Sequence, residues 1–132
     1  MPHLRIKDAA AHLGVSDDTV RRWVDRGLLE ARVDDAGRKV VDGYEVAMVA
    51  RDHAQQPGVP GMSSARNRFV GLVTDITLDT VMAQVELQCG PFRVVSLMSS
   101  EAVRDLGLER GSLAVASIKS TNVVIEAHEG MA

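Results

Sequence analysis

Ser63-Ser64-Ala65-Arg66-Asn67-Arg68-Phe69-Val70-Gly71 divides this chain of 132 residues into two parts of different character. The residues before it show the spacing of short helices, and the residues after it show the alternation of strands. The stretch also brings a hydroxyl, a guanidinium and an amide close together at Ser64, Arg66 and Asn67. Anion sites are built from such donors, so the predicted function depends on whether this stretch meets Lys119 in the folded chain.

The composition is that of a soluble globular protein, with 45% apolar and 25% charged residues. The formal net charge is −3, so DNA binding has to be argued from a local surface and not from the total charge. A single cysteine, Cys89, excludes an internal disulfide and a Cys-based zinc site. No apolar run approaches membrane-spanning length and the N-terminus has no hydrophobic signal region, so we expect a cytoplasmic protein with no membrane partner.

Residues 1–54 predict a helical unit that contains a helix-turn-helix. Apolar spacing over residues 6–13 indicates a first helix, which Gly14 ends. Ser16 can cap a second helix, which Gly27 ends. Two short helices joined by Gly-Val-Ser have the spacing of a helix-turn-helix.

A hairpin and a third helix are expected to follow. Residues 31–41 predict two short strands around an Asp-Ala-Gly turn, with basic residues near the tip. Asp42 can cap a helix over residues 43–53, with four candidate packing residues, Tyr44, Ala47, Met48 and Ala50. The outward face of the second helix and the hairpin tip carry the residues expected to bind DNA, which are Ser16, Thr19, Arg21, Arg22, Arg26, Arg38 and Lys39.

The charge pattern leaves a simpler interpretation open. Residues 1–56 hold nine basic and ten acidic side chains, so the helix arginines could be only a solvated face balanced by neighbouring aspartates. A monomer of this charge would bind DNA weakly and would lose it quickly as salt rises.

Three motifs nevertheless resemble the winged helix-turn-helix of MerR-type and excisionase-type DNA-binding proteins. They are Val15-Ser16, Thr19-Val20-Arg21-Arg22-Trp23 and Gly27-Leu28-Leu29, followed by a Gly-Arg-Lys hairpin. The resemblance covers residues 4 to about 54. It implies that the second helix enters the major groove and that the wing touches the backbone or the minor groove.

Residues 55–63 contain two prolines and two glycines without periodicity, which predicts a linker. The predicted domains are therefore residues 1–54 and 64–132. In the second domain, strands are expected over residues 69–77, 80–88, 91–98, 113–119 and 122–126, with a short helix over 101–106 capped by Ser99 or Ser100. In the second strand the inward residues are Val81, Ala83, Val85 and Leu87.

Five strands and one short helix predict a small closed barrel of the OB type, which hides its edges. The fold class is then α+β with two domains, a winged helix-turn-helix and a small OB-like β-barrel. Such a barrel need not bind a ligand. A lysine at a strand end is usually solvated, and a serine before a helix is usually only its cap.

Four motifs of the second domain are similar, in order and spacing, to the Mop domain, the molybdate- and tungstate-binding domain of the TOBE class. They are Ser64-Ala65-Arg66-Asn67, a strand ending in Ser99, Asp105-Leu106-Gly107-Leu108-Glu109-Arg110-Gly111 and Ile118-Lys119-Ser120-Thr121. The match spans residues 64–126. Mop domains occur in small molybdenum-binding proteins, in transporter ATPases and in molybdate-responsive regulators.

The resemblance implies an oxyanion site at an interface between subunits or domains. The implied ligand residues are Ser64, Ala65, Arg66, Asn67, Ser99, Ser100, Lys119 and Ser120. Molybdate is a tetrahedral dianion that only accepts hydrogen bonds, so hydroxyls, N–H groups and cations suit it. One position departs from the family, which often has a serine where this chain has Ala102, and Ser100 could replace it.

The sequence thus predicts a molybdate- or tungstate-responsive transcriptional regulator that binds double-stranded DNA. Two units of this size are marginal alone, so a homo-oligomer is expected, either a dimer or a hexamer. Two alternatives stay open: an intracellular molybdate or tungstate storage protein, and an excisionase-like architectural DNA binder whose barrel only oligomerises. An enzyme is not expected, because no phosphate loop, catalytic triad or paired carboxylates can be found.

Overall fold

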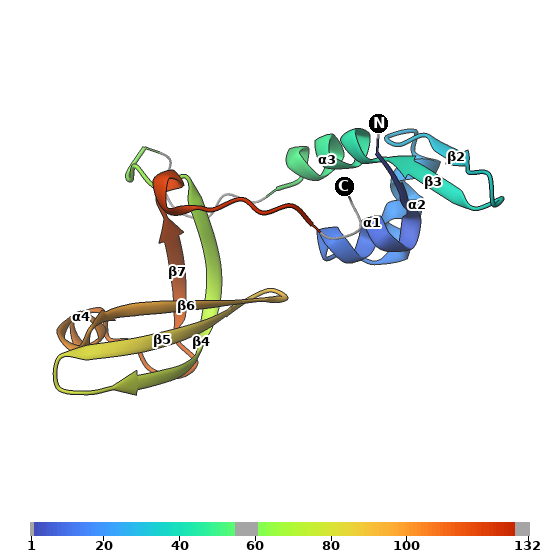
Figure 1. The fold of residues 1–132 in the computed structure, drawn as a ribbon. Coiled ribbons are helices and arrows are strands. Elements are labelled where there is room, and N and C mark those ends of the chain that lie inside the picture. Colours follow the sequence, from blue (N-terminus) through green and yellow to red (C-terminus); the bar gives the residue numbers. More distant parts are fainter. Residues whose placement is uncertain (1, 55–60, 129–132) are drawn as a thin grey trace. The chain divides into compact units, whose positions relative to one another are not determined.

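The computed structural model describes residues 2–54 and 61–128, which form two compact units. Residues up to Gln55 form the first unit together with the chain's last residues from Ala127, and Gln56–Glu126 form the second. Figure 1 shows a helical unit at the N-terminal, blue end of the sequence and a sheet unit in the later colours. Most of the predicted linker, residues 55–60, lies outside the described residues, so the domain boundaries stay a prediction.

The first unit is a winged helix-turn-helix. In chain order its elements are β1 (His3–Arg5), α1 (Ile6–Leu13), α2 (Asp17–Asp25), β2 (Ala31–Val33), β3 (Lys39–Asp42) and α3 (Gly43–Asp52). β3 lies between β1 and β2 in an antiparallel sheet. The helix-turn-helix, the hairpin and the third helix are confirmed. β1 was missed, since a strand of three residues has no alternation that could reveal it.

The helix ends follow the predicted capping residues. The Ser16 hydroxyl accepts a hydrogen bond from the Thr19 N–H at 3.1 Å, and an Asp42 carboxylate oxygen accepts one from the Glu45 N–H at 3.1 Å. Gly14 ends α1 with φ of 68°, a left-handed conformation that suits glycine. These interactions are local, since each joins residues within a few positions of one another in the sequence.

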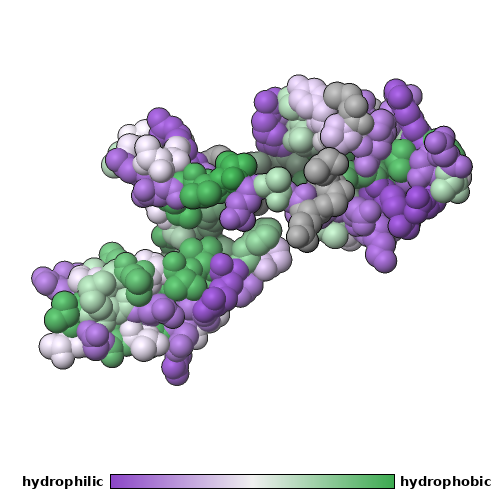
Figure 2. Space-filling model, in the orientation of Figure 1, coloured by the Kyte–Doolittle hydropathy of each residue, from purple (hydrophilic) through white to green (hydrophobic). Residues whose placement is uncertain are grey.

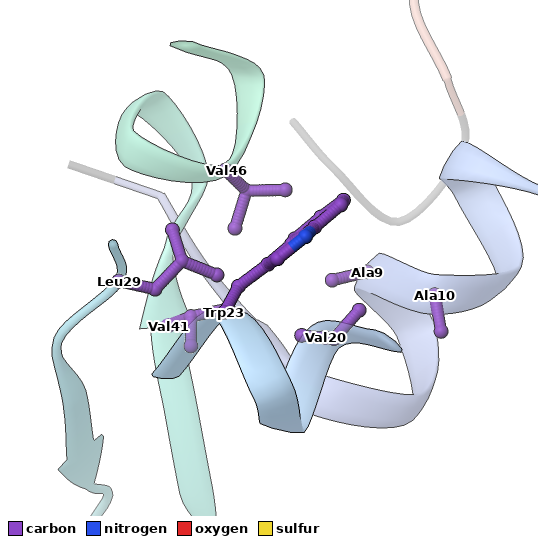
Figure 3. Packing of buried hydrophobic residues seen from close by; sticks show 7 residues of the cluster. All are labelled: Ala9, Ala10, Val20, Trp23, Leu29, Val41 and Val46. Carbon is purple, nitrogen blue, oxygen red and sulfur yellow. The ribbon is translucent and has the colours of Figure 1, made fainter. Parts of the chain in front are cut away.

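Trp23 fills the centre of the first core (Figure 3). It packs with small and branched side chains from all three helices and from β3, namely Ala9, Ala10, Val20, Leu29, Val41 and Val46. The predicted packing face of α3 was partly wrong, because Tyr44 is 59% exposed and Ala47 is exposed. Val46 is the buried residue of this helix, with Val49 packed beside it.

The second unit is a half-barrel of four antiparallel strands among its described residues. Its elements are β4 (Asn67–Leu78), β5 (Met82–Cys89), β6 (Phe92–Ser99), α4 (Ser100–Leu106), β7 (Leu113–Ile118) and a 3-10 turn, η1 (Ser120–Asn122). The strand order is β6-β5-β4-β7. The inner face carries Val73, Ala83, Val85, Leu87 and Cys89, and Val103 of α4 packs against it.

Two predictions for this unit are corrected by the structure. Residues 122–126 form no strand, because no described strand edge lies beside them to supply hydrogen bonds, and the barrel is therefore open between β6 and β7. Val81, predicted to point inward, is 68% exposed. It lies in the β4–β5 turn, where Asp79 accepts hydrogen bonds from the N–H groups of Val81 and Met82 at 2.8 and 2.7 Å.

Gly71 lies where β4 passes closest to β5. A Cβ at this position would be 2.5 Å from Cys89 Sγ and 2.7 Å from the Gln88 carbonyl oxygen. Protein interiors are close-packed, so contacts this short require the backbone to move. The glycine is needed for the approach of the two strands.

We therefore expect Gly71→Ala to lower the free energy of unfolding by about 1–3 kcal/mol. Urea unfolding followed by circular dichroism measures this change. Gln84→Ala, an exposed position of the same sheet, is the control and should change stability by less than about 0.5 kcal/mol. Equal stability of the two variants would contradict the close approach of β4 to β5.

Candidate anion site and nucleic-acid interface

The exposed face of α2 carries a row of polar side chains three residues apart. The hydroxyls of Ser16 and Thr19 lie 2.9 Å apart, and Arg22 Nη2 donates to the Thr19 hydroxyl at 3.5 Å. Arg26 follows four residues after Arg22, and its side chain forms no hydrogen bond or ion pair with any other described residue. The row places two guanidinium groups and two hydroxyls where a helix in the major groove meets base edges and phosphates.

Arg21 lies beside this row and is held less firmly. Its Nη1 is 3.5 Å from Asp18 Oδ1, and the two side chains are 59% and 86% exposed. Exposed pairs of this kind contribute about 0–1 kcal/mol, so a phosphate can replace the aspartate at little cost. Arg21 is therefore suited to a backbone contact rather than to base recognition.

The wing between β2 and β3 is fixed by Asp34. One carboxylate oxygen accepts hydrogen bonds from the N–H groups of Ala36 and Arg38, each at 2.9 Å, and the other lies 3.3 Å from Arg38 Nε. The Arg38 N–H lowers the pKa of Asp34 below its ordinary value, and the Ala36 N–H and the Arg38 guanidinium add to this. The ionised Asp34 carboxylate therefore stabilises the wing above the ordinary pKa of this group, and the stabilisation is lost as the pH falls through the lowered pKa. Lys39 follows at the start of β3 without a side-chain partner among the described residues.

The pairing of β4 with β7 brings the two predicted anion-binding motifs together. Asn67 lies opposite Ile118, and Asn67 Nδ2 donates to the Ile118 carbonyl oxygen at 3.1 Å. Ser64, Arg66 and Lys119 therefore lie at the same end of this strand pair. This register places Asn67, the residue after Arg66, beside Ile118, the residue before Lys119.

This end of the strand pair offers donors and cations. Ala65 is 6% exposed, and its N–H donates to Ser63 Oγ at 3.1 Å, which anchors the motif. The side chains of Ser64, Arg66, Lys119 and Ser120 are exposed. Arg66 Nη1 donates only to the Ser63 carbonyl oxygen, at 3.4 Å. Neither 63–74 nor 112–125 contains an aspartate or glutamate, so no carboxylate from these segments competes with an anion.

Ser99 and Ser100 have different roles in the single chain. Ser99 caps α4, and its hydroxyl accepts a hydrogen bond from the Ala102 N–H at 3.0 Å. Ser100 is fully buried, and its hydroxyl donates to the carbonyl oxygens of Asp79 and Met82 at 2.8 and 3.0 Å. The suggestion that Ser100 replaces a ligand at Ala102 is therefore corrected: its hydroxyl already holds the β4–β5 turn.

The two halves of the predicted site lie at opposite ends of β4. Ser99 pairs with Met82, beside the turn that follows Leu78, whereas Lys119 lies beyond the Asn67 end. At about 3.3 Å per residue, a strand of twelve residues separates its ends by up to roughly 40 Å. One chain therefore does not bring Ser99 and Lys119 to a common ligand.

The open side of the half-barrel is an apolar groove of about 670 Å³. Side chains of β5, β6 and β7 line it, together with Leu106 at the end of α4 and Leu108 just after this helix. Figure 2 shows apolar surface in green on this unit, where several large side chains are more than half exposed: Phe92, Leu97, Leu106, Leu113, Val124 and Ile125. Patches of this kind on a soluble unit mark an interaction surface.

Two features are absent from residues 2–54 and 61–128, a membrane-spanning helix and a cluster of metal-binding side chains. No helix there is both long and apolar enough to span a bilayer. No group of three or more histidine, cysteine, aspartate or glutamate side chains is placed to hold a metal cation.

Comparison with protein families gives two matches. The family described as helix-turn-helix domain matches residues 4–44, and the family described as TOBE domain matches residues 63–125. Both are binding domains rather than catalytic ones. Together they account for the two units of the structure.

Three relatives each match about half of this chain. Molybdenum-pterin-binding protein 3 of Clostridium pasteurianum is 40% identical over 63 residues, which are 47% of this chain and 93% of the relative. The solved structure of apo MopII of the same organism is 36% identical and covers 49% of this chain and 98% of its own, with a TM-score of 0.47. The cytoplasmic molybdate-binding protein ModG, solved with molybdate bound, is 38% identical over 49% of this chain and 47% of its own, with a TM-score of 0.47.

Proposed function

Since the chain belongs, through residues 63–125, to the TOBE-domain family of molybdenum-pterin-binding proteins and carries a helix-turn-helix domain at residues 4–44, we propose that it is a molybdate- or tungstate-responsive transcriptional regulator. The protein acts in the cytoplasm. Its first unit binds double-stranded DNA and its second unit binds the oxyanion.

The main support for this proposal is the register of β4 against β7. It pairs Asn67 with Ile118, and Ser64, Arg66 and Lys119 all lie within three residues of this pair in the chain, which supports a common site for their exposed hydroxyl, guanidinium and ammonium groups. A tetrahedral dianion needs donors and positive charge, and a nearby carboxylate would repel it. The described geometry meets these requirements at this end of the sheet and at no other place that we found among the described residues.

The site is completed by a second copy of the chain. Ser99 caps α4 at the far end of β4, so its hydroxyl reaches a ligand of Lys119 only from another subunit. Val123, Val124 and Ile125 are 40%, 82% and 87% exposed and form an apolar run that association with another chain would bury. In an oligomer this segment pairs with an open strand edge of the second copy and covers its apolar groove.

DNA binding is then linked to the oxyanion. The first unit has nine basic and ten acidic side chains over residues 1–56, so one copy binds DNA weakly, whereas several copies held together bind more tightly. An oxyanion bound between subunits can favour one arrangement of the linked DNA-binding units over another. It then changes DNA affinity only by the difference between its binding free energies for the two arrangements, typically about 1–3 kcal/mol.

An oxyanion storage protein is the second candidate. Residues 63–125 alone match 93% of molybdenum-pterin-binding protein 3, so a relative almost wholly composed of this unit exists without a helix-turn-helix of this kind. Storage requires only the second unit and predicts no sequence-specific DNA binding.

The oxyanion half is tested by titration calorimetry with molybdate, tungstate and sulfate. Lys119→Ala should weaken molybdate binding about 10- to 100-fold, because a charge-assisted hydrogen bond is lost. Lys7→Ala removes an exposed lysine of the first unit and is the matched control, with binding unchanged. If the folded wild type binds neither molybdate nor tungstate, the proposed function is wrong.

The subunit arrangement is tested by light scattering after size-exclusion chromatography. Val124→Asp should shift the protein toward the monomer, because a charge at this position opposes burial in the groove. Val33→Asp, at a position 66% exposed on the first unit, is the control and should leave the mass unchanged. An unchanged oligomer in Val124→Asp would show that residues 122–126 do not hold the subunits together.

The DNA half is tested by footprinting on the chain's own genomic region, with and without saturating molybdate. The double variant Arg22→Ala and Arg26→Ala should lose the footprint, whereas Arg51→Ala, whose guanidinium lies 3.9 Å from Asp52 on α3, should keep it. Molybdate should change the affinity about 5- to 150-fold. A footprint that does not respond to oxyanion would contradict regulation, and the absence of any footprint would favour storage.

A further inference from the structure

One basic side chain at the anion-binding end of the sheet belongs to none of the family motifs. Arg68 lies on β4 directly opposite Ser117 of β7. Arg66 directly precedes β4 and Lys119 directly follows β7, just beyond the pair formed by Asn67 and Ile118, and Lys119 keeps an extended backbone with φ of −65° and ψ of 142°.

Strand alternation places these four residues on one face of the strand pair. Side chains two residues apart on a strand point to the same side, and directly opposite residues share a face. Arg68 and Ser117 therefore lie on the same face as Arg66 and Lys119. The other face includes Gly71 and Val73, which are buried, and is the inner one.

Three cations are thus gathered within a short distance. Directly opposite Cβ atoms are about 5 Å apart, and diagonal pairs are about 7–8 Å apart. None of the three is in an ion pair with any described residue, and only Arg66 has a side-chain hydrogen bond, to a main-chain carbonyl. The other arginines of this unit differ in this respect, since Arg93 pairs with Glu86 and Arg110 pairs with Asp75, while Arg104 lies away on α4.

Like charges held together without a counter-ion repel one another, and a bound anion removes this repulsion. Arg68 adds a planar fork that can donate to two oxygens of a tetrahedral anion, and the exposed hydroxyl of Ser117 adds one more donor beside it. The gain grows with the charge of the anion, so a dianion gains more than a monoanion of the same shape.

We propose that Arg68, paired with Ser117, extends the oxyanion site along the outer face of β4 and β7 and makes it selective for tetrahedral dianions over monoanions. This inference rests on the proposed oxyanion-binding function. It assigns a ligand role to a residue that the motifs leave out.

The test compares tungstate with perrhenate, a tetrahedral monoanion of similar size, by titration calorimetry on the full-length protein. Arg68→Gln should weaken tungstate binding about 10- to 100-fold, and perrhenate binding much less, so that the ratio of the two affinities falls. Arg104→Gln makes the same change of charge at an exposed position on α4 and should stay within about twofold of the wild type.

The outcomes separate this inference from the proposed function. If the wild type binds neither anion, the proposed function fails. If the wild type binds tungstate and Arg68→Gln behaves like Arg104→Gln, only the role of Arg68 is wrong. A loss of DNA binding without any change in tungstate affinity would also overturn it, because Arg68 would then be a phosphate contact.

A second variant keeps the test decisive if Arg68→Gln does not assemble. Arg68→Lys keeps the charge and loses the fork, so it should bind tungstate about threefold to tenfold more weakly than the wild type. Full wild-type affinity in an assembled Arg68→Lys protein, with the ratio of tungstate to perrhenate affinity unchanged, would contradict a bidentate contact.

Discussion

The hydrogen bond from the Asn67 side chain to the Ile118 carbonyl oxygen holds the first residue of β4 against the last residue of β7. The candidate anion site depends on this register. A shift of one residue would turn Arg66 and Lys119 to opposite faces and would expose the inner residues of β4. Gly71 contributes to the same constraint, since its missing side chain lets β4 lie close to β5 while it pairs with Ala114 of β7.

The second unit is physically incomplete as a single chain. β6 and β7 are open edges, the groove between them is apolar, and the segment that could fill it is exposed. Open edges and exposed apolar surface favour association, so in the proposed oligomer the sheet that makes half of the anion site also forms the contact that supplies the other half. In that oligomer, the stability and the ligand binding of this unit follow from one assembly step.

Sequence patterns predicted what local chemistry determines. The caps at Ser16 and Asp42, the left-handed glycine at position 14 and the inward alternation of β5 all depend on neighbours within a few residues. The predictions that failed concern positions whose structure depends on contacts with residues far away in the sequence. Residues 122–126 contain an apolar β-branched run but have no described strand edge to join, and Ser100 looks like a helix cap although its hydroxyl holds a turn some twenty residues earlier. Arg68 lies in the stretch from Ser63 to Gly71 that divides the chain, but only its register with Ser117 shows which face of the sheet it occupies.

In the first unit, the end of α3 is held against the core just before the predicted linker begins. The His53 ring lies 5.9 Å from the Trp23 ring, and His53 Nδ1 lies 2.8 Å from the Val49 carbonyl oxygen, so the end of α3 is fixed to the buried side of α2. A restriction on the chain after residue 54 therefore acts on the helix that carries Arg22 and Arg26, and not on a loose end. Since this unit has almost no net charge, its affinity for DNA depends on how many copies are presented together and how freely each can turn. If an oxyanion is bound between subunits as proposed, it changes both quantities without touching the DNA-binding surface, so a modest coupling energy is sufficient for the proposed regulation.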